Sequence, residues 1–179
     1  MPFLELKDGR LHYELEGSSQ APVLVLSNSL ASALTMWEPQ VKPFAQRFRL
    51  LRYDQRGHGQ SLVTPGPYTT AQLAGDVLAL LDGLKIERAH FCGLSMGGAA
   101  GMWIATHAPD RVNKLILSNT AAKFGTPEIW ATRIESVHKG GMQAVADATM
   151  ERWFTAGFRA ASPQVVEKIR QSLLATSPA

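Results

Sequence analysis

The sequence predicts an α/β fold with a mostly parallel sheet and flanking helices. Segments typical of strands alternate with segments typical of helices from residue 22 to residue 118, and this alternation favours parallel strands joined by helical crossovers. Residues 23–26 form a continuous apolar run, as expected of a strand buried on both faces. The 179 residues, 45% of them hydrophobic and 18% charged, are sufficient for a folded domain with a sizeable core.

The elements before the centre of the chain follow in order. Residues 4–6 and 11–15 flank Lys7-Asp8-Gly9-Arg10 and predict a hairpin with an Asp-Gly turn. Residues 23–26 and 48–53 predict strands, with a helix over 35–44 between them. Residues 70–84 predict an amphipathic helix that Thr69 or Thr70 caps.

The later elements divide the chain in two. Residues 89–92 and 112–117 predict strands on either side of a helix that ends near His107. After residue 119 the pattern predicts only helices, over 129–137, 142–154 and 163–174, with breaks at Gly140-Gly141 and Gly157. We therefore expect a sheet-containing core over residues 1–120 and a helical cap or lid over residues 121–179.

The segment Gly93-Leu94-Ser95-Met96-Gly97 predicts the chemistry of the chain. It lies between a predicted strand and a predicted helix, so Ser95 would occupy a sharp, strained turn at the carboxyl end of the strand. Glycine has no Cβ to collide with the neighbouring backbone two positions before and after the serine. The helix N-terminus and the Met96 amide would then favour negative charge beside the Ser95 hydroxyl. The alternative is a glycine-rich turn that carries an ordinary surface serine.

Composition excludes several other classes of function. A net charge of +3 is compatible with a small anionic substrate, and the arginines at 47, 49, 52 and 56 lack the interleaved aromatics of a nucleic-acid surface. The single cysteine, Cys92, cannot form an intrachain disulfide and is expected to be a small buried side chain. No signal peptide or membrane-spanning run is visible, so we expect a cytoplasmic protein with no membrane or nucleic-acid partner and no metal site.

With these motifs in place, the chain resembles the α/β-hydrolases, and more narrowly the 3-oxoadipate enol-lactonases of aromatic compound catabolism, in the β-ketoadipate pathway. The narrower resemblance depends on a few short blocks of sequence. These are Leu26-Ser27-Asn28-Ser29-Leu30, Met36-Trp37, Tyr53-Asp54-Gln55-Arg56-Gly57-His58-Gly59, Gly93-Leu94-Ser95-Met96-Gly97-Gly98, Trp130-Ala131-Thr132-Arg133-Ile134 and Glu151-Arg152-Trp153-Phe154.

The resemblance implies a cofactor-free serine hydrolase that opens a carboxylated enol-lactone. Ser95 would attack the carbonyl and form an acyl-enzyme, with the backbone N–H groups of Leu30 and Met96 as oxyanion donors. In the cap, the small anionic lactone would meet Arg133, with Arg152 as the second cationic candidate. Substrate contacts are also expected from Trp130, Trp153 and Ser29, although helix arginines can be merely solvated and tryptophans can simply pack the lid.

The resemblance also implies an acid and a histidine base after the serine, in that order. Only His107 and His138 follow Ser95, and neither lies after a predicted strand. We therefore expect the acid and base to lie outside this chain, with the last strands of the family's sheet missing. The alternatives are another hydrolase of the same fold, such as an esterase, a perhydrolase or a carbon–carbon bond hydrolase, and an inactive truncated protein.

Overall fold

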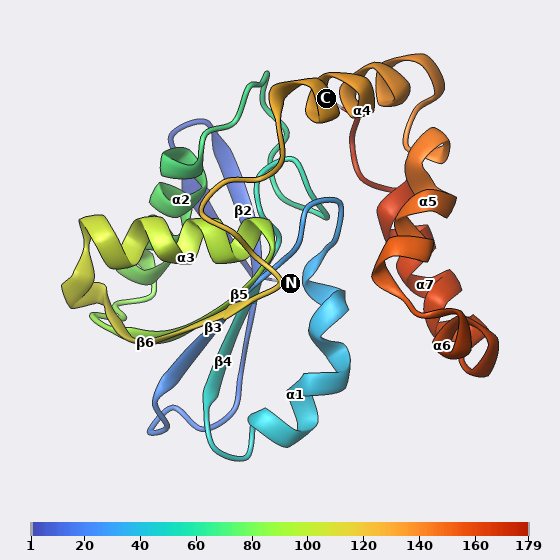
Figure 1. Cartoon of the computed structure of the whole chain (residues 1–179). Helices are drawn as coiled ribbons and strands as arrows, with labels where there is room; N and C mark the ends of the chain where they lie inside the picture. Colours follow the sequence, from blue (N-terminus) through green and yellow to red (C-terminus); the bar gives the residue numbers. More distant parts are fainter. Residues whose placement is uncertain (1, 179) are drawn as a thin grey trace. The chain divides into compact units, whose positions relative to one another are not determined.

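The computed structural model describes residues 2–178, in which six strands form one sheet in the order β1-β2-β4-β3-β5-β6. Helices lie on both sides of this sheet, α1 on one side and α2 with α3 on the other (Figure 1). The prediction of an α/β fold with a mostly parallel sheet and flanking helices is confirmed. The alternation of strands and helices predicts this fold because the crossover helices between parallel strands cover both faces of the sheet.

The first two strands, β1 (Phe3–Leu6) and β2 (Gly9–Glu16), form the predicted antiparallel hairpin. The turn differs from the prediction in one respect. Leu6 pairs with Gly9, so the loop is Lys7-Asp8, and Gly9 is the first residue of β2 with a φ of +146°. Gly9 was expected in the turn itself, but its permissive backbone instead starts the second strand.

The other four strands pair with one another in parallel, and β4 also pairs antiparallel with β2. β3 (Val23–Ser27) lies between β4 (Arg49–Tyr53) and β5 (Ala89–Leu94), and β5 also pairs with β6 (Val112–Ser118). Successive side chains of a strand point to opposite faces. Leu24 and Leu26 accordingly pack on one face of the sheet with Trp37, whereas Val25 packs on the other face with Phe91. β3 is therefore buried on both faces, as its continuous apolar sequence predicts.

Three α-helices follow strands within this part of the chain. The predicted helix over 35–44 is a 3-10 turn, η1 (Leu34–Trp37), that continues into α1 (Glu38–Phe44). α2 (Thr70–Gly83) begins after Thr69, whose side chain accepts a hydrogen bond from the Gln72 N–H and caps the helix as expected. α3 (Met96–His107) follows the turn at Ser95, and a short 3-10 turn, η2 (Pro109–Arg111), leads into β6.

The elements described after β6 are all helices, as predicted, but the breaks between them differ. α4 (Pro127–Gly140) ends at the expected glycine pair, and Gly141 has a φ of +63°. α5 (Gln143–Trp153) and α7 (Pro163–Leu174) match the other two predicted helices. Gly157 is not a break, because it lies inside the short helix α6 (Ala156–Ala161). The chain instead turns before Thr155, whose hydroxyl accepts from the Phe158 N–H at the start of α6.

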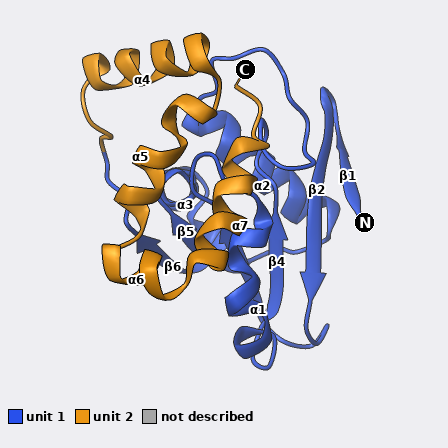
Figure 2. Ribbon diagram, turned by 90° about the vertical axis from the view of Figure 1, so that its right-hand side faces the viewer, with its two compact units in different colours: residues 1–122, 179 blue, residues 123–178 orange. Residues whose placement is uncertain are grey.

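The chain divides into two compact units, one up to Ala122 and the other over Lys123–Pro178 (Figure 2). Exposed hydrophobic side chains occur on both units, including Ile116 and Leu117 on the edge strand of the first unit and Ile129 and Ile134 on the second.

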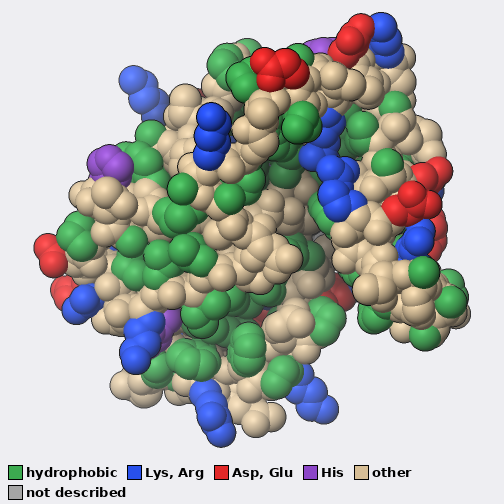
Figure 3. Space-filling model, viewed as in Figure 1, with side chains coloured by type: hydrophobic (Ala, Val, Ile, Leu, Met, Phe, Trp, Pro, Cys, Tyr) green, Lys and Arg blue, Asp and Glu red, His purple; other side chains and the backbone are tan. Residues whose placement is uncertain are grey.

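Figure 3 shows hydrophobic, basic and acidic side chains interspersed over one face of the molecule. No helix within residues 2–178 is long and apolar enough to cross a membrane.

Candidate active site at the turn between β5 and α3

Ser95 occupies the turn between β5 and α3 in a strained backbone conformation. Its φ of +54° and ψ of −114° lie in a region that residues with a side chain rarely adopt. Hydrogen bonds from the Ser95 N–H to the Ser118 carbonyl (2.9 Å) and from the Thr120 hydroxyl to the Ser95 carbonyl (2.7 Å) hold the turn from the end of β6. The surrounding backbone therefore imposes the conformation that the sequence motif predicts.

The two glycines that flank Ser95 allow the backbones to approach closely. A Cβ on Gly93 would lie 2.4 Å from the Gly97 carbonyl oxygen, and one on Gly97 would lie 2.3 Å from the Ser27 carbonyl oxygen. Both distances are far inside van der Waals contact, and both neighbours are backbone atoms that cannot rotate away. The turn can therefore close against the end of β3 only when both positions lack a side chain.

The Ser95 hydroxyl has no hydrogen-bond partner among residues 2–178. It does not cap α3, although Ser95 is the N-cap residue of that helix. The side chain is half-buried, at the helix end where unpaired N–H groups and the macrodipole favour negative charge. The N–H of Met96, the first residue of α3, has no acceptor in the described chain.

The loop after β3 reaches the same edge of the sheet. Ser27 pairs with Gly93 in the parallel register, and the Gly97 N–H donates to the Asn28 carbonyl (2.9 Å), so this loop is bonded directly to the first turn of α3. Leu30 follows two residues later, is half-buried, and belongs to neither hydrophobic core cluster. Its N–H, like that of Met96, has no acceptor within residues 2–178.

A buried polar network fixes the carboxyl ends of β3 and β4. The Ser27 hydroxyl lies 2.7 Å from the Tyr53 hydroxyl, and the Gln55 amide donates both to Ser27 Oγ (3.1 Å) and to the Asn28 carbonyl (2.9 Å). The Asn28 side chain accepts from the Trp37 indole and donates to the Tyr53 carbonyl, both at 2.8 Å. Burial raises the pKa of Tyr53, so its phenol stays protonated. Gln55 Oε1 is buried without a hydrogen-bond partner among the described residues, but the other contacts join the ends of the two strands through five side-chain hydrogen bonds.

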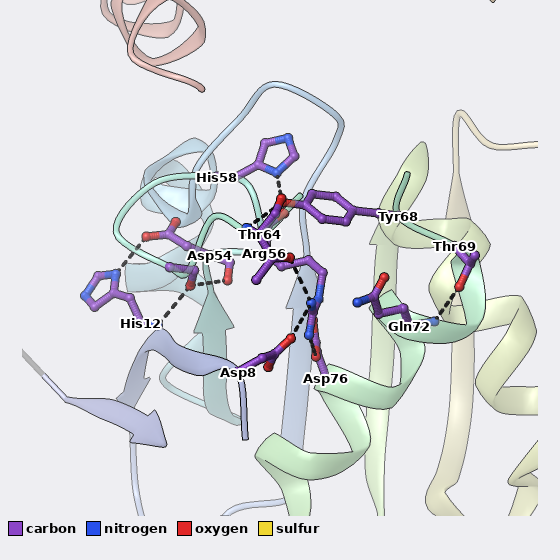
Figure 4. Close-up of polar contacts among 11 residues, drawn as sticks. Asp8, His12, Asp54, Arg56, His58, Thr64, Tyr68, Thr69, Gln72 and Asp76 are labelled. Carbon is purple, nitrogen blue, oxygen red and sulfur yellow. Dashed lines mark hydrogen bonds and ion pairs between the residues drawn. The ribbon is translucent and has the colours of Figure 1, made fainter. Parts of the chain in front are cut away.

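The loop after β4, residues 54–61, is fixed by ionic and hydrogen-bonded side chains (Figure 4). Asp54 accepts from the Leu34 N–H (2.7 Å) and lies 2.7 Å from Nδ1 of His12 on β2. The Arg56 guanidinium forms a two-pronged pair with Asp76 of α2, with N–O distances of 2.6 and 2.7 Å, and this pairing raises the pKa of Arg56. These contacts give Arg56 a structural role in this loop.

His58 lies in this loop and is buried as a neutral side chain. The Ala31 N–H donates to His58 Nε2 (2.9 Å), so Nε2 is unprotonated and Nδ1 carries the proton that it donates to the Arg56 carbonyl (3.0 Å). Burial lowers the pKa of His58, although the nearby Asp54 charge opposes that effect. These contacts give His58 a structural role, and its bond to Ala31 connects the two loops.

This arrangement predicts a dependence of stability on pH. Because the pKa of His58 is lower in the folded protein than its ordinary 6.5, the unfolded chain binds the proton first as the pH falls. The free energy of unfolding should therefore decrease below pH 6.5, with a His58 contribution of at most about 1.4 kcal/mol per pH unit. Urea unfolding at pH 7.5, 6.5 and 5.5 measures this slope. The variant His58→Gln should have a smaller slope, and an unchanged slope would contradict the assignment.

The other histidines of the first unit have different contacts. His12 is buried against Asp54. The His90 ring packs edge-on against Phe48. His107, the last residue of α3, donates from Nδ1 to the Trp103 carbonyl (2.9 Å) and stacks on the Trp103 ring. Burial raises the pKa of the Cys92 thiol, which therefore stays protonated and is a poor nucleophile. Within residues 2–178, no three His, Cys, Asp or Glu side chains are arranged to hold a metal ion.

Comparison with known proteins agrees with this geometry. Residues 22–155 match the model of the alpha/beta hydrolase fold. The chain belongs to this family. Among its relatives, 3-oxoadipate enol-lactonase 2 of Acinetobacter baylyi is 44% identical over 170 residues, which cover 95% of this chain and 64% of that protein. The chain thus spans about two thirds of the length of this relative.

Solved structures are also similar to this chain. The enol-lactonase from Burkholderia xenovorans LB400 superimposes with a TM-score of 0.96 at 47% identity, over 99% of this chain and 69% of that one. A thermophilic esterase from Thermogutta terrifontis has a TM-score of 0.87 at 32% identity, over 95% and 63% of the two chains. The resemblance to α/β-hydrolases, and to enol-lactonases among them, is confirmed.

The second unit contains the remaining predicted site residues of this alpha/beta hydrolase. Trp130 and Arg133 lie on α4, with the guanidinium 5.5 Å from the centre of the Trp130 ring, and the Trp130 indole is fixed by a hydrogen bond to the Phe124 carbonyl (2.6 Å). Arg133 is half-buried, and its burial and the charge of Arg152 on α5 lower the pKa of Arg133. Trp153 is also half-buried. Neither Arg133 nor Arg152 forms an ion pair within residues 2–178.

The sequence does not reveal the role of Ser32 or the partner of His58. Ser32 is buried and donates to the Ser29 carbonyl (2.7 Å), and Ser29, expected to contact substrate, is itself 7% exposed. The contact of His58 with Ala31 was also not foreseen, since the two residues are 27 positions apart. The only available signal for Ser32 was its place two residues after Leu30.

Proposed function

We propose that this protein hydrolyses a carboxylated enol-lactone, 3-oxoadipate enol-lactone, through an acyl-enzyme on Ser95. The observation that carries the proposal is a serine held at a positive φ at the N-terminus of α3, with its hydroxyl unbonded and the Met96 N–H unpaired beside it. Similarity to proteins named enol-lactonases supports the choice of substrate.

The proposed mechanism depends on where negative charge forms as the serine attacks the lactone. Attack of Ser95 Oγ on the lactone carbonyl forms the C–O bond of a tetrahedral intermediate and places negative charge on the carbonyl oxygen. The N–H groups of Met96 and Leu30 would bind that oxyanion, and losing one such donor typically costs about 3 kcal/mol of transition-state stabilisation. Collapse of the intermediate breaks the ring C–O bond, and water then hydrolyses the acyl-enzyme to release the open product.

The proton of Ser95 requires a base, and none of the five histidines is placed as one. His12 bonds Asp54, His58 bonds Ala31, His90 packs against Phe48, His107 lies at the opposite end of α3 from the serine, and His138 lies in the last turn of α4 in the second unit. We therefore propose that the base and its acid partner lie outside these 179 residues. No cofactor is part of this proposal, because ester hydrolysis by an activated serine needs none.

We propose that the substrate carboxylate is bound in the second unit by Arg133. The support is electrostatic: two guanidinium groups, those of Arg133 and Arg152, lie close enough to repel, and neither has a carboxylate partner within residues 2–178. A bound anion would relieve this repulsion and form a charge-assisted pair. Trp130 would hold the guanidinium through its ring, and Trp153 would contribute apolar surface.

A comparison of the turnover of the enol-lactone with that of a simple ester tests the choice of substrate. The protein expressed from its own gene should open the enol-lactone with a kcat/KM at least about 100-fold above that for p-nitrophenyl acetate, since only the lactone carries the carboxylate. Equal turnover of both would instead favour a general esterase of the same fold. Absence of turnover on either would remove the hydrolase proposal.

Substitution of Arg133 tests the carboxylate contact. Arg133→Gln should raise KM for the lactone by about 10- to 100-fold with little change in kcat, because a charge-assisted bond contributes about 1.5–3 kcal/mol to binding. Hydrolysis of neutral p-nitrophenyl acetate should not change. Arg170→Gln is the matched control, because Arg170 lies in the same unit but already pairs with Asp147. An equal rise in KM for both variants would contradict a specific role for Arg133.

A further inference from the structure

The loop that carries Leu30 is held by contacts on both sides of this residue. Leu30 N–H belongs to the Ser29–Leu30 peptide, whose carbonyl accepts from the Ser32 hydroxyl (2.7 Å). The next peptide, Leu30–Ala31, is held by its own N–H, which donates to His58 Nε2 (2.9 Å). Each of the two peptide planes that meet at Leu30 is therefore bound by one side chain.

Peptide planarity converts the Ser32 contact into an orientation of the Leu30 N–H. The C=O and N–H of a trans peptide point in opposite directions, and rotation about the C–N bond is prevented by a barrier of about 18–20 kcal/mol. With the Ser29 carbonyl fixed by Ser32, the Leu30 N–H must point the other way, where the described chain offers it no acceptor. A hydrogen bond accepted by the carbonyl also polarises the amide and makes its N–H a stronger donor.

Ser32 and His58 are both placed to act in this way. Ser32 is 3% exposed, and although its hydroxyl also lies 3.1 Å from the Met36 sulfur, a carbonyl is the stronger acceptor. His58 is 5% exposed, and its Nδ1 is fixed by the Arg56 carbonyl. Ala31 has a φ of +60°, a left-handed conformation that an alanine rarely adopts, so the loop needs an external contact to keep it.

We propose that Ser32 and His58 are positioning residues that hold the two peptide planes at Leu30 and keep the Leu30 N–H directed at the oxyanion formed during attack by Ser95. This proposal rests on the proposed function of Ser95. It adds that the donor is preorganised by two side chains that never touch the substrate. Preorganised donors stabilise charge without reorganising during the reaction.

The kinetic test uses the protein expressed from its own gene. Ser32→Ala should lower kcat for the enol-lactone by about 10- to 100-fold with KM changed less than about threefold, because the oxyanion forms only after binding. Ser32→Thr, which keeps the hydroxyl, should recover most of the lost kcat. Thr149→Val is the matched control, because Thr149 is fully buried and its hydroxyl also donates to a carbonyl, that of Val145 (2.6 Å). It removes one buried hydroxyl and should leave kcat within about twofold of the parent protein.

Binding of an inhibitor that forms a tetrahedral adduct distinguishes a misdirected Leu30 N–H from a general disruption of the site. A trifluoromethyl ketone forms an oxyanion adduct on a serine nucleophile, so its affinity should fall in Ser32→Ala by the same factor as kcat/KM. Affinity for the open carboxylate product, which has no oxyanion at this position, should not change. A kcat within twofold of the parent in Ser32→Ala, a loss confined to KM, or an equal loss in Thr149→Val would overturn the proposal. These results differ from failure of the proposed function, in which the parent protein itself shows no turnover that depends on Ser95.

Discussion

Replacement of Ser95 by alanine is expected to reduce lactone turnover by about 10⁴-fold or more, the loss typical when a catalytic serine is deleted. Without Oγ no acyl-enzyme can form, and only the oxyanion donors and substrate binding would remain to accelerate direct attack by water. Steady-state kinetics on the protein expressed from its own gene, together with a search for a covalent adduct by mass spectrometry, measures this effect. Retained turnover in Ser95→Ala would remove Ser95 from the mechanism.

Stability measurements separate the chemical role of Ser95 from its backbone strain. Ser95→Ala keeps the Cβ and hence the strain, so its free energy of unfolding should stay close to that of the parent protein. Ser95→Gly removes the penalty of the +54° φ and should unfold at a higher urea concentration, with a gain of about 1 kcal/mol. A destabilised Ser95→Gly variant would indicate that the turn is not strained.

Gly97→Ala is expected to have the second largest effect. The new Cβ would lie 2.3 Å from the Ser27 carbonyl oxygen and 2.5 Å from its carbon, so the end of β3 and the start of α3 would have to separate. We expect a loss of about 3 kcal/mol in the free energy of unfolding, at the upper end for overpacking. Turnover should fall by about 100-fold, because a shift of about 1 Å misplaces the serine. Chemical unfolding and steady-state kinetics measure the two effects.

Gly75→Ala is the matched control for this experiment. Gly75 lies on the exposed side of α2, where a Cβ would meet no atom within 4 Å. Alanine is the better helix former by about 0.5–1 kcal/mol, so the variant should be slightly more stable and equally active. Equal behaviour of the two alanine variants would show that the approach of Gly97 to Ser27 does not limit the structure.

The sequence predicts those parts of the fold that depend on local pattern. A strand buried on both faces has an unbroken run of apolar residues, as at Val23–Ser27. A helix buried on one face has apolar residues every three or four positions, as at Thr70–Gly83. The two elements can therefore be told apart from sequence. The short helix α6 was missed because Gly157 lies within it, and a six-residue helix contains too few turns to show a period. The hairpin loop was displaced by one residue because Gly9 can serve either in a turn or at the start of a strand.

In the candidate site, too, only the features contained in a short stretch of sequence could be predicted. Ser95, with Gly93 and Gly97, could be predicted because the whole turn is contained in five consecutive residues. The contacts of Ser32 with Ser29 and of His58 with Ala31 could not, since hydroxyl and imidazole side chains carry no sign of their partner until the loops after β3 and β4 are brought together. The pairing of His12 with Asp54 was likewise invisible, because 42 residues separate them.

The attachments of the Ser95 turn have a consequence for divergence within the family. The hydrogen bonds that attach the turn to its surroundings, those with Asn28, Ala99, Ser118 and Thr120, all involve residues before 123. Mutations in the helices α4–α7 therefore remove none of these hydrogen bonds. Under the function proposed for Ser95 and Arg133, descendants of one ancestral gene could acquire new substrate preferences by changing those helices, while inheriting the same serine turn and its attachments.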